Sequence, residues 1–130
     1  MTKAKILVID DEPGIRALLT QELTAQGYEV ASSGDSLEAV KRLERERYQV
    51  VLCDINMPKL GGLEVLAEIL RHDPVTRVIM MTGYGTDETV AEAMLRGAFD
   101  FVQKPFNLTD ISSRVKNAVT HTEADPTESI

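Results

Sequence analysis

The sequence predicts an α/β domain built on a doubly wound, five-stranded parallel sheet. Five short apolar runs alternate with five segments in which apolar residues recur at helical spacing. Such strict alternation favours parallel strands joined by right-handed helical crossovers, with helices on both faces of the sheet. A chain of 130 residues with 43% hydrophobic positions is the size of one ordinary domain and can bury a core.

Two kinds of apolar run predict the order of the strands. The runs at 5–9, 49–53 and 77–81 are almost continuously apolar, which is typical of interior strands, whereas 28–32 and 99–102 alternate, which is typical of edge strands. Strands one, three and four then lie inside, and the predicted order is 2-1-3-4-5, a (βα)5 flavodoxin-like arrangement. A ligand is expected beyond the carboxyl ends of the strands, where the order reverses between strands one and three.

Apolar stripes predict the five helices, one after each strand. Pro13 suits a first helical turn, and Gly27 and Gly97 suit helix C-termini. Asn107, with Asp110 three residues later, suits the N-terminal cap of the last helix. The stripes comprise Ile15, Leu18, Leu19 and Leu23; Leu37, Val40 and Leu43; Leu63, Leu66 and Leu70; Val90, Ala93 and Met94; and Ile111, Val115 and Val119.

Charge and cysteine content narrow the class of protein. The 14 basic and 21 acidic residues give a net charge of −7, which argues against direct DNA binding and against anionic membrane surfaces. Cys53 is the only cysteine, so no internal disulfide can form, and a lone thiol suits the reducing cytosol. The apolar run after the N-terminus is too short for a signal peptide or a membrane span. We therefore expect a cytoplasmic protein.

One domain is expected over residues 1–120, followed by a flexible polar tail at 121–130. The last ten residues are mostly polar and contain Pro126, which is typical of a loose terminus. Such a tail is too short for an effector domain. We therefore expect either a stand-alone domain or one excised from a longer protein.

Polar side chains follow four of the predicted strands where each strand ends. They are Asp10, Asp11 and Glu12 after the first strand, Asp54 after the third, Thr82 after the fourth, and Lys104 after the fifth. The carboxyl ends of parallel strands share one edge of a sheet, so these side chains are expected to meet in one cleft. Carboxylates so close repel one another unless a cation lies between them, and oxygen ligands of this kind suit Mg²⁺.

This chemistry predicts a phosphoryl acceptor. With Mg²⁺ and Lys104 drawing off negative charge, a phosphoryl group can approach Asp54, and a carboxylate oxygen can attack phosphorus in line to form an acyl phosphate. Lys104 would form an ion pair with phosphoryl oxygens, and the Thr82 hydroxyl would donate a hydrogen bond to another phosphoryl oxygen. Taken singly, each motif suits an ordinary loop or helix end. Their coincidence at four strand ends is what favours a site.

The segments 8–12, 52–62, 81–84 and 101–106 resemble the response regulator receiver family, and the resemblance extends from residue 4 to about 120. It implies a phosphorylation switch of a two-component phosphorelay rather than a conventional enzyme. A sensor histidine kinase, a phosphotransfer protein or a small phosphodonor would supply the phosphoryl group in an Mg²⁺-dependent reaction. The protein would assist its own phosphorylation and dephosphorylation.

The resemblance also assigns roles to individual residues. It implies that Asp54 is the phosphoacceptor, that Lys104 and Thr82 act with it in catalysis, and that the bond from Lys104 to Pro105 is cis. The implied Mg²⁺ ligands are Asp10, Asp11, Asp54 and the backbone carbonyl of Asn56.

The resemblance implies a switch as well as a reaction. Thr82 would move toward the phosphoryl group, Phe101 would rotate, and the surface of helix four, strand five and helix five would repack. The phosphorylated form is expected to bind a downstream effector or a second copy as a homodimer. Tyr84 and Asn56 flank the cleft and are expected to adjust the access of water. The segment 85–101 is most similar to receivers of enhancer-binding transcription activators.

Two other classes of protein share parts of this pattern. A haloacid dehalogenase-like phosphatase also uses an aspartate nucleophile, Mg²⁺, a hydroxyl and a lysine, but its nucleophile follows the first strand in an Asp-x-Asp pattern. A flavin or nucleotide carrier has the same topology, yet the loop after strand one here is acidic and repels phosphate. Turnover of a chromogenic phosphate ester, or a bound yellow cofactor, would favour these alternatives.

Overall fold

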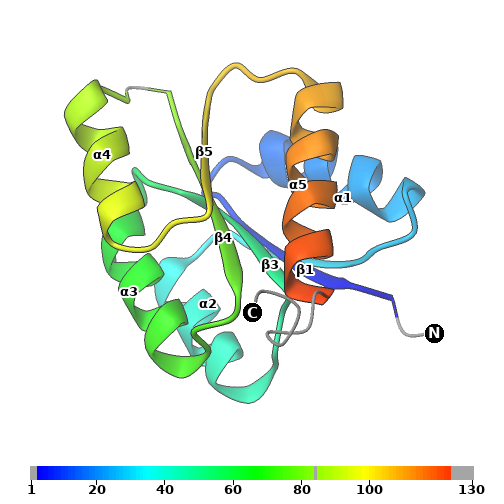
Figure 1. Ribbon diagram of the computed structural model, residues 1–130, viewed down its shortest axis with the longest axis horizontal. Coiled ribbons are helices and arrows are strands. Elements are labelled where there is room, and N and C mark those ends of the chain that lie inside the picture. Colours follow the sequence, from blue (N-terminus) through cyan, green and yellow to red (C-terminus); the bar gives the residue numbers. More distant parts are fainter. Residues whose placement is uncertain (1–2, 84, 124–130) are drawn as a thin grey trace, which may run out of the picture.

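The computed structural model describes residues 3–83 and 85–123, which form a single parallel sheet flanked by helices (Figure 1). The strand order is β2-β1-β3-β4-β5, as the sequence predicts, and every neighbouring pair is parallel. The elements in chain order are β1 Lys5–Ile9, α1 Pro13–Ala25, β2 Glu29–Ser33, α2 Ser36–Arg45, β3 Val50–Asp54, α3 Gly62–His72, β4 Arg77–Thr82, α4 Asp87–Leu95, β5 Asp100–Gln103 and α5 Leu108–Glu123.

The sheet separates two hydrophobic clusters. Helices α1 and α5 cover one face, and α2, α3 and α4 cover the other (Figure 1). Successive side chains of a strand point to opposite faces, so Ile6 and Val8 of β1 join the first cluster while Leu7 and Ile9 join the second. Because both faces are covered, the interior strands are apolar at consecutive positions, as predicted.

Local signals set the ends of the helices. Pro13 begins α1, and Gly27 and Gly97 adopt left-handed backbone conformations, with φ values of 96° and 105°, just beyond the ends of α1 and α4. The Asn107 side chain accepts hydrogen bonds from the amides of Thr109 (2.7 Å) and Asp110 (3.2 Å) at the start of α5. These helix-end predictions are confirmed.

The end of α5 differs from the expectation. The helix continues to Glu123, so it extends into the segment 121–130 for which the sequence predicts a tail. The His121 ring packs edge-on against Phe99, with ring centroids 5.1 Å apart, and its Nδ1 lies 2.9 Å from the carbonyl of Asn117. The contact with Phe99 joins the end of α5 to the segment just before β5. Residues 124–130 lie outside the described part of the chain.

Within the described residues, none of the helices combines the length and apolar character needed to cross a membrane.

Candidate functional site

Four strand ends deliver their side chains to one edge of the sheet. Asp10 follows β1, Asp54 and Thr82 end β3 and β4, and Lys104 follows β5. Asp10, Asp54 and Thr82 are buried, with at most 4% of each residue exposed. Asp54 lines an open cleft of about 520 Å³, together with Glu12 and Lys104. The structure therefore brings together the side chains that the sequence places at the strand ends.

Lys104 lies between three carboxylates. Its Nζ is 2.7 Å from Asp10 Oδ2, 3.0 Å from Glu12 Oε1 and 3.3 Å from Asp54 Oδ2. Burial lowers the pKa of this ammonium, but the hydrogen bonds to Asp10 and Glu12 and the nearby negative charges outweigh burial and raise the pKa overall. Lys104 is therefore a permanent positive charge in the cleft.

The backbone fixes the position of Lys104. Its amide donates a 2.7 Å hydrogen bond to the carbonyl of Thr82, which extends the pairing of β4 with β5 by one residue. The following bond to Pro105 is cis, as the resemblance implies. The lysine thus leaves the strand beside the end of β4, and its side chain reaches Asp54 at the end of β3.

Asp10 is completely buried. Its Oδ1 accepts a 2.9 Å hydrogen bond from the amide of Glu12, while its Oδ2 faces Lys104 and accepts no other hydrogen bond from the described residues. Burial raises the pKa of the Asp10 carboxyl, and the Lys104 ammonium and the Glu12 amide offset part of that rise. A further cation beside Oδ2 would stabilise the charged form.

Asp54 is held from both sides. The amide of Asn56 donates to its Oδ1 at 3.1 Å, and Lys104 faces its Oδ2. The Asn56 side-chain amide also donates to the Thr82 hydroxyl at 2.9 Å. Asn56 thus connects the carboxylate after β3 to the hydroxyl at the end of β4.

Phe101 of β5 is half-buried and packs against the second hydrophobic cluster. Gly85 lies close to both Phe101 and Thr82. A Cβ added to Gly85 would be 3.2 Å from Phe101 Cε1 and 2.7 Å from the Thr82 methyl carbon. Gly85 therefore touches both Thr82 and Phe101, the two residues for which the family resemblance implies a switch role. The neighbouring Tyr84 lies outside the described residues.

The carboxylates fit a divalent cation. Oxygen atoms of Asp10, Glu12 and Asp54 lie within 4.8 Å of one another, and an all-oxygen donor set of this kind suits Mg²⁺. The expected ligand Asp11 is exposed and lines the same cleft, but it is not part of this cluster. Glu12 belongs to the cluster instead: its amide donates a hydrogen bond to Asp10 Oδ1, and its carboxylate pairs with Lys104.

Arg16 supports the acidic turn and was not identified from the sequence. Its guanidinium donates a 2.7 Å hydrogen bond to the carbonyl of Asp10 and lies against Gly34, where a Cβ would be 2.5 Å from Arg16 Nη1. The only sign of this role in the local sequence is that Arg16 lies four residues after Glu12. The contact with Gly34 joins segments that are distant in the sequence.

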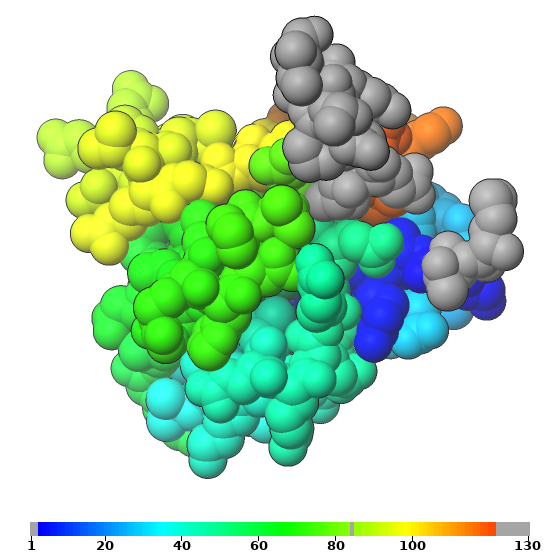
Figure 2. Space-filling view, turned by 60° about the horizontal axis from the view of Figure 1, so that its bottom comes forward, coloured from blue at the N-terminus to red at the C-terminus, as the bar shows by residue number. Residues whose placement is uncertain are grey.

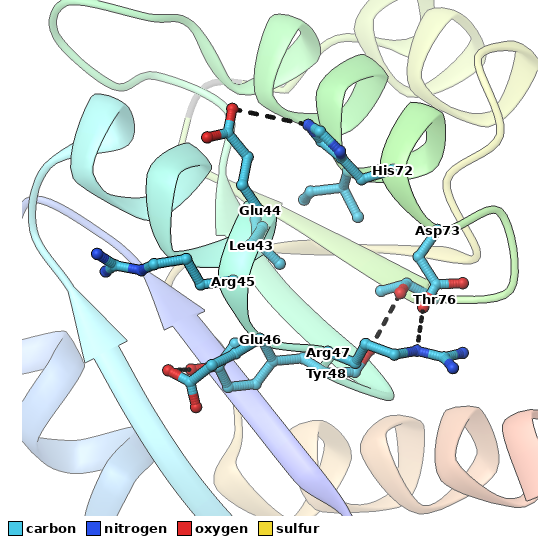
Figure 3. A pocket seen from close by; sticks show the side chains of 10 residues that line it. Leu43, Glu44, Arg45, Glu46, Arg47, Tyr48, His72, Asp73 and Thr76 are labelled. Atoms are coloured by element: carbon cyan, nitrogen blue, oxygen red, sulfur yellow. Dashed lines mark hydrogen bonds and ion pairs between the residues drawn. The ribbon is translucent and has the colours of Figure 1, made fainter.

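A second hollow lies at the opposite, amino-terminal edge of the sheet. Figure 2 views the molecule from this side, with the segment between α2 and β3 near the front. The labelled side chains come from the ends of α2 and α3 and the residues that follow them (Figure 3). Several are paired: Arg47 with Asp73 at 3.0 Å, His72 with Glu44 at 3.8 Å, and the buried Thr76 hydroxyl with the carbonyl of Tyr48 at 3.0 Å. This hollow is separate from the acidic cleft.

A family model described as response regulator receiver domain matches residues 6–116. Regulatory protein AtoC of Escherichia coli (strain K12) is 37% identical over 115 residues, which cover 88% of this chain and 25% of AtoC. Sporulation initiation phosphotransferase F of Bacillus subtilis (strain 168) is 35% identical over 116 residues, which cover 89% of this chain and 94% of that protein. The chain thus spans about a quarter of the first relative and nearly all of the second.

Solved structures show the same similarity. The crystal structure of a response regulator receiver domain protein (CheY-like) from Methanospirillum hungatei JF-1 superposes with a TM-score of 0.90 at 30% sequence identity. The match covers 94% of this chain and 98% of the other. Fold and sequence similarity therefore agree.

Proposed function

Because the chain belongs to the response regulator receiver domain family, we propose that it is a phosphoacceptor switch in which Asp54 accepts a phosphoryl group in an Mg²⁺-dependent reaction. One observation carries this proposal. The buried Asp54 carboxylate lies 3.3 Å from the Lys104 ammonium at the edge of a cleft that Glu12 also lines, and it forms an acidic cluster with Asp10 and Glu12. A carboxylate with a fixed cation beside it is suited to nucleophilic attack on a phosphoryl group.

Asp54 is the nucleophile in the proposed reaction. One of its carboxylate oxygens attacks phosphorus, and the new O–P bond forms as the bond from phosphorus to the donor breaks. The donor, a phosphohistidine of a kinase or phosphotransfer protein or an acyl phosphate, leaves with the electron pair of that bond. The Asn56 amide restrains the rotation of the carboxylate by its bond to Oδ1. Lys104 neutralises charge on the phosphoryl oxygens.

Asp10, Glu12 and Asp54 are the side chains that would hold Mg²⁺, and Asp11 and the Asn56 carbonyl are further candidates from the family resemblance. When bound, the ion supplies positive charge that offsets the repulsion between the phosphoryl group and these carboxylates. The buried Oδ2 of Asp10 supports this assignment, because its one partner among the described residues is Lys104.

Thr82 and Phe101 form the proposed switch. Thr82 would leave its hydrogen bond with Asn56 and donate to the phosphoryl group, and Phe101 would rotate into the space released. The contacts of Gly85 with both side chains support a mechanical link between them. The surface of α4, β5 and α5 would then repack. On α4 this surface exposes Met94 (43%) and Leu95 (85%), which suits a protein partner.

The proposed partners follow from this mechanism. A sensor histidine kinase or a phosphotransfer protein would donate the phosphoryl group, and a downstream effector or a second copy of the chain would bind the phosphorylated form. Direct contact with DNA or a membrane is not part of the proposal, and the net charge of −7 supports that choice. The site of action would be the cytoplasm.

Intact-mass measurement tests the proposed function. The protein is incubated with Mg²⁺ and acetyl phosphate, and we expect one added phosphoryl group that is missing in Asp54→Asn. Asp73→Asn, at the other edge of the sheet, is the matched control and should gain the same adduct. An unmodified parent protein would contradict the proposal. Rapid turnover of a chromogenic phosphate ester would favour a phosphatase instead.

A further inference from the structure

The loop from β3 to α3, residues 55–61, carries Asn56 and is called here the phosphoacceptor loop. Backbone hydrogen bonds tie its two ends to the sheet and to itself: the Ile55 amide donates to Met81 at 2.8 Å, and the Gly62 amide donates to Ile55 at 3.0 Å. The middle of the loop is held by side chains from the start of α2.

Ser36 makes two of these contacts. Its hydroxyl donates to the carbonyl of Pro58 at 3.0 Å and accepts from the amide of Leu60 at 3.0 Å. Ser36 is completely buried, so water cannot replace the hydroxyl without a rearrangement. The neighbouring Asp35, which caps α2, forms an ion pair with Lys59, a residue held in the left-handed region with a φ of 69°. The side chains of Asp35 and Ser36 therefore bind three consecutive loop residues, 58–60.

The loop and the first residue of α3 are each in direct contact with the nucleophile. In the loop, the Asn56 amide donates to Asp54 Oδ1. In α3, a Cβ on Gly62 would lie 2.5 Å from the Asp54 carbonyl oxygen, so the start of α3 rests on the Asp54 backbone with no space between them. A shift in the middle of the loop is therefore transmitted to Asp54 from both sides.

We propose that Ser36 is a positioning residue for the phosphorylation reaction: its hydroxyl holds the phosphoacceptor loop in the shape that orients Asn56 and Asp54. This inference rests on the proposed function. Without the hydroxyl, the Pro58 carbonyl and the Leu60 amide lose their buried partner, and the loop must move to satisfy them. That movement displaces the Asn56 amide from Asp54. The carboxylate then spends less time in the orientation needed for in-line attack.

Ser36→Ala is the test variant, and Thr76→Val is the matched control. Thr76 is also buried and its hydroxyl also donates to a backbone carbonyl at 3.0 Å, but at the opposite edge of the sheet (Figure 3). Both variants should fold and lose some thermal stability. With acetyl phosphate at saturating Mg²⁺, we expect Ser36→Ala to gain the phosphoryl group roughly tenfold more slowly than the parent, and Thr76→Val to match the parent.

An amide NMR spectrum of the unphosphorylated proteins separates positioning from general destabilisation. The chemical shift of the Asn56 backbone amide should change in Ser36→Ala and stay as in the parent in Thr76→Val. A parent-like phosphorylation rate in Ser36→Ala, an equal loss of rate in both variants, or an unmoved Asn56 signal would each overturn the inference. If the parent itself gains no phosphoryl group, the proposed function fails, and the Asn56 signal still decides whether Ser36 positions the loop.

Discussion

At the scale of one residue, Asp10 lowers the stability of the folded protein at neutral pH while it contributes a carboxylate to the proposed ion site. The carboxylate is completely buried, and burial raises its pKa above the ordinary value of 3.8. A raised carboxyl pKa means that the folded protein favours the protonated, neutral form. At neutral pH the charged form therefore reduces the free energy of unfolding. Lys104 recovers only part of this cost.

We expect Asp10→Asn to be more stable than the parent at pH 7, by about 1 kcal/mol. The amide removes the buried charge, and Lys104 keeps Glu12 and Asp54 as partners. The gain should be largest above the raised pKa of Asp10. It should shrink as the pH falls through that pKa toward 3.8, because the parent then protonates Asp10 itself. Denaturant unfolding of both proteins over this pH range provides the measurement.

Asp11→Asn is the matched control for this pH effect. Asp11 is the exposed neighbour of Asp10, so its replacement should give no comparable gain in stability. An Asp10→Asn protein that is less stable than the parent at neutral pH would show that the pair with Lys104 outweighs the burial of the charge.

At the scale of an element, α5 depends on its first turn and on its buried stripe. Asn107 satisfies two amides at the N-terminus, and Ile111, Val115 and Ala118 pack into the first hydrophobic cluster. Most of the stability of a helix in a protein comes from tertiary packing of its apolar face, so the cap and the packing together keep α5 folded. The helix in turn forms one side of the proposed output surface.

Asn107→Ala should lower the free energy of unfolding by about 1 kcal/mol, because the amides of Thr109 and Asp110 lose their side-chain acceptor. Asn117→Ala is the control, since Asn117 is exposed within the same helix and alanine has the higher helix propensity. Chemical denaturation compares the two variants. Equal stabilities for both would argue against a capping role for Asn107.

At the scale of the whole molecule, folding brings three carboxylates together at the proposed ion site. Asp10 and Glu12 follow β1 and Asp54 ends β3, so the three converge only in the folded state, where Lys104 is their one shared cation among the described residues. The unfolded chain has no such assembled site. A cation that binds the folded state alone must therefore raise the free energy of unfolding.

Mg²⁺ should raise the melting temperature, and at a hundredfold excess over its dissociation constant it should add about 2.7 kcal/mol to the free energy of unfolding. Removal of the ion with EDTA should reverse the shift. Glu44→Gln, at the amino-terminal edge, should keep the full response, whereas Asp10→Asn should lose most of it. An equal response to NaCl at matched ionic strength would indicate general screening rather than a site.

The sequence by itself determined the order of the strands and the membership of the cleft. Apolar runs distinguish covered strands from edge strands, because solvent on one face selects for alternation. Once the strands are parallel, the residues after their carboxyl ends share one edge, and so Asp10, Asp54, Thr82 and Lys104 must be neighbours. These inferences need only periodicity and topology.

Tertiary structure alone decided which side chains touch. That Glu12 rather than Asp11 joins the acidic cluster depends on a turn capped by Asp10 and on the reach of Lys104. Two other contacts likewise join segments that are distant in the sequence: the hydrogen bonds of Ser36 to the phosphoacceptor loop and the packing of His121 against Phe99. Sequence periodicity records which face of an element is buried, whereas contacts between elements depend on how those elements pack against one another.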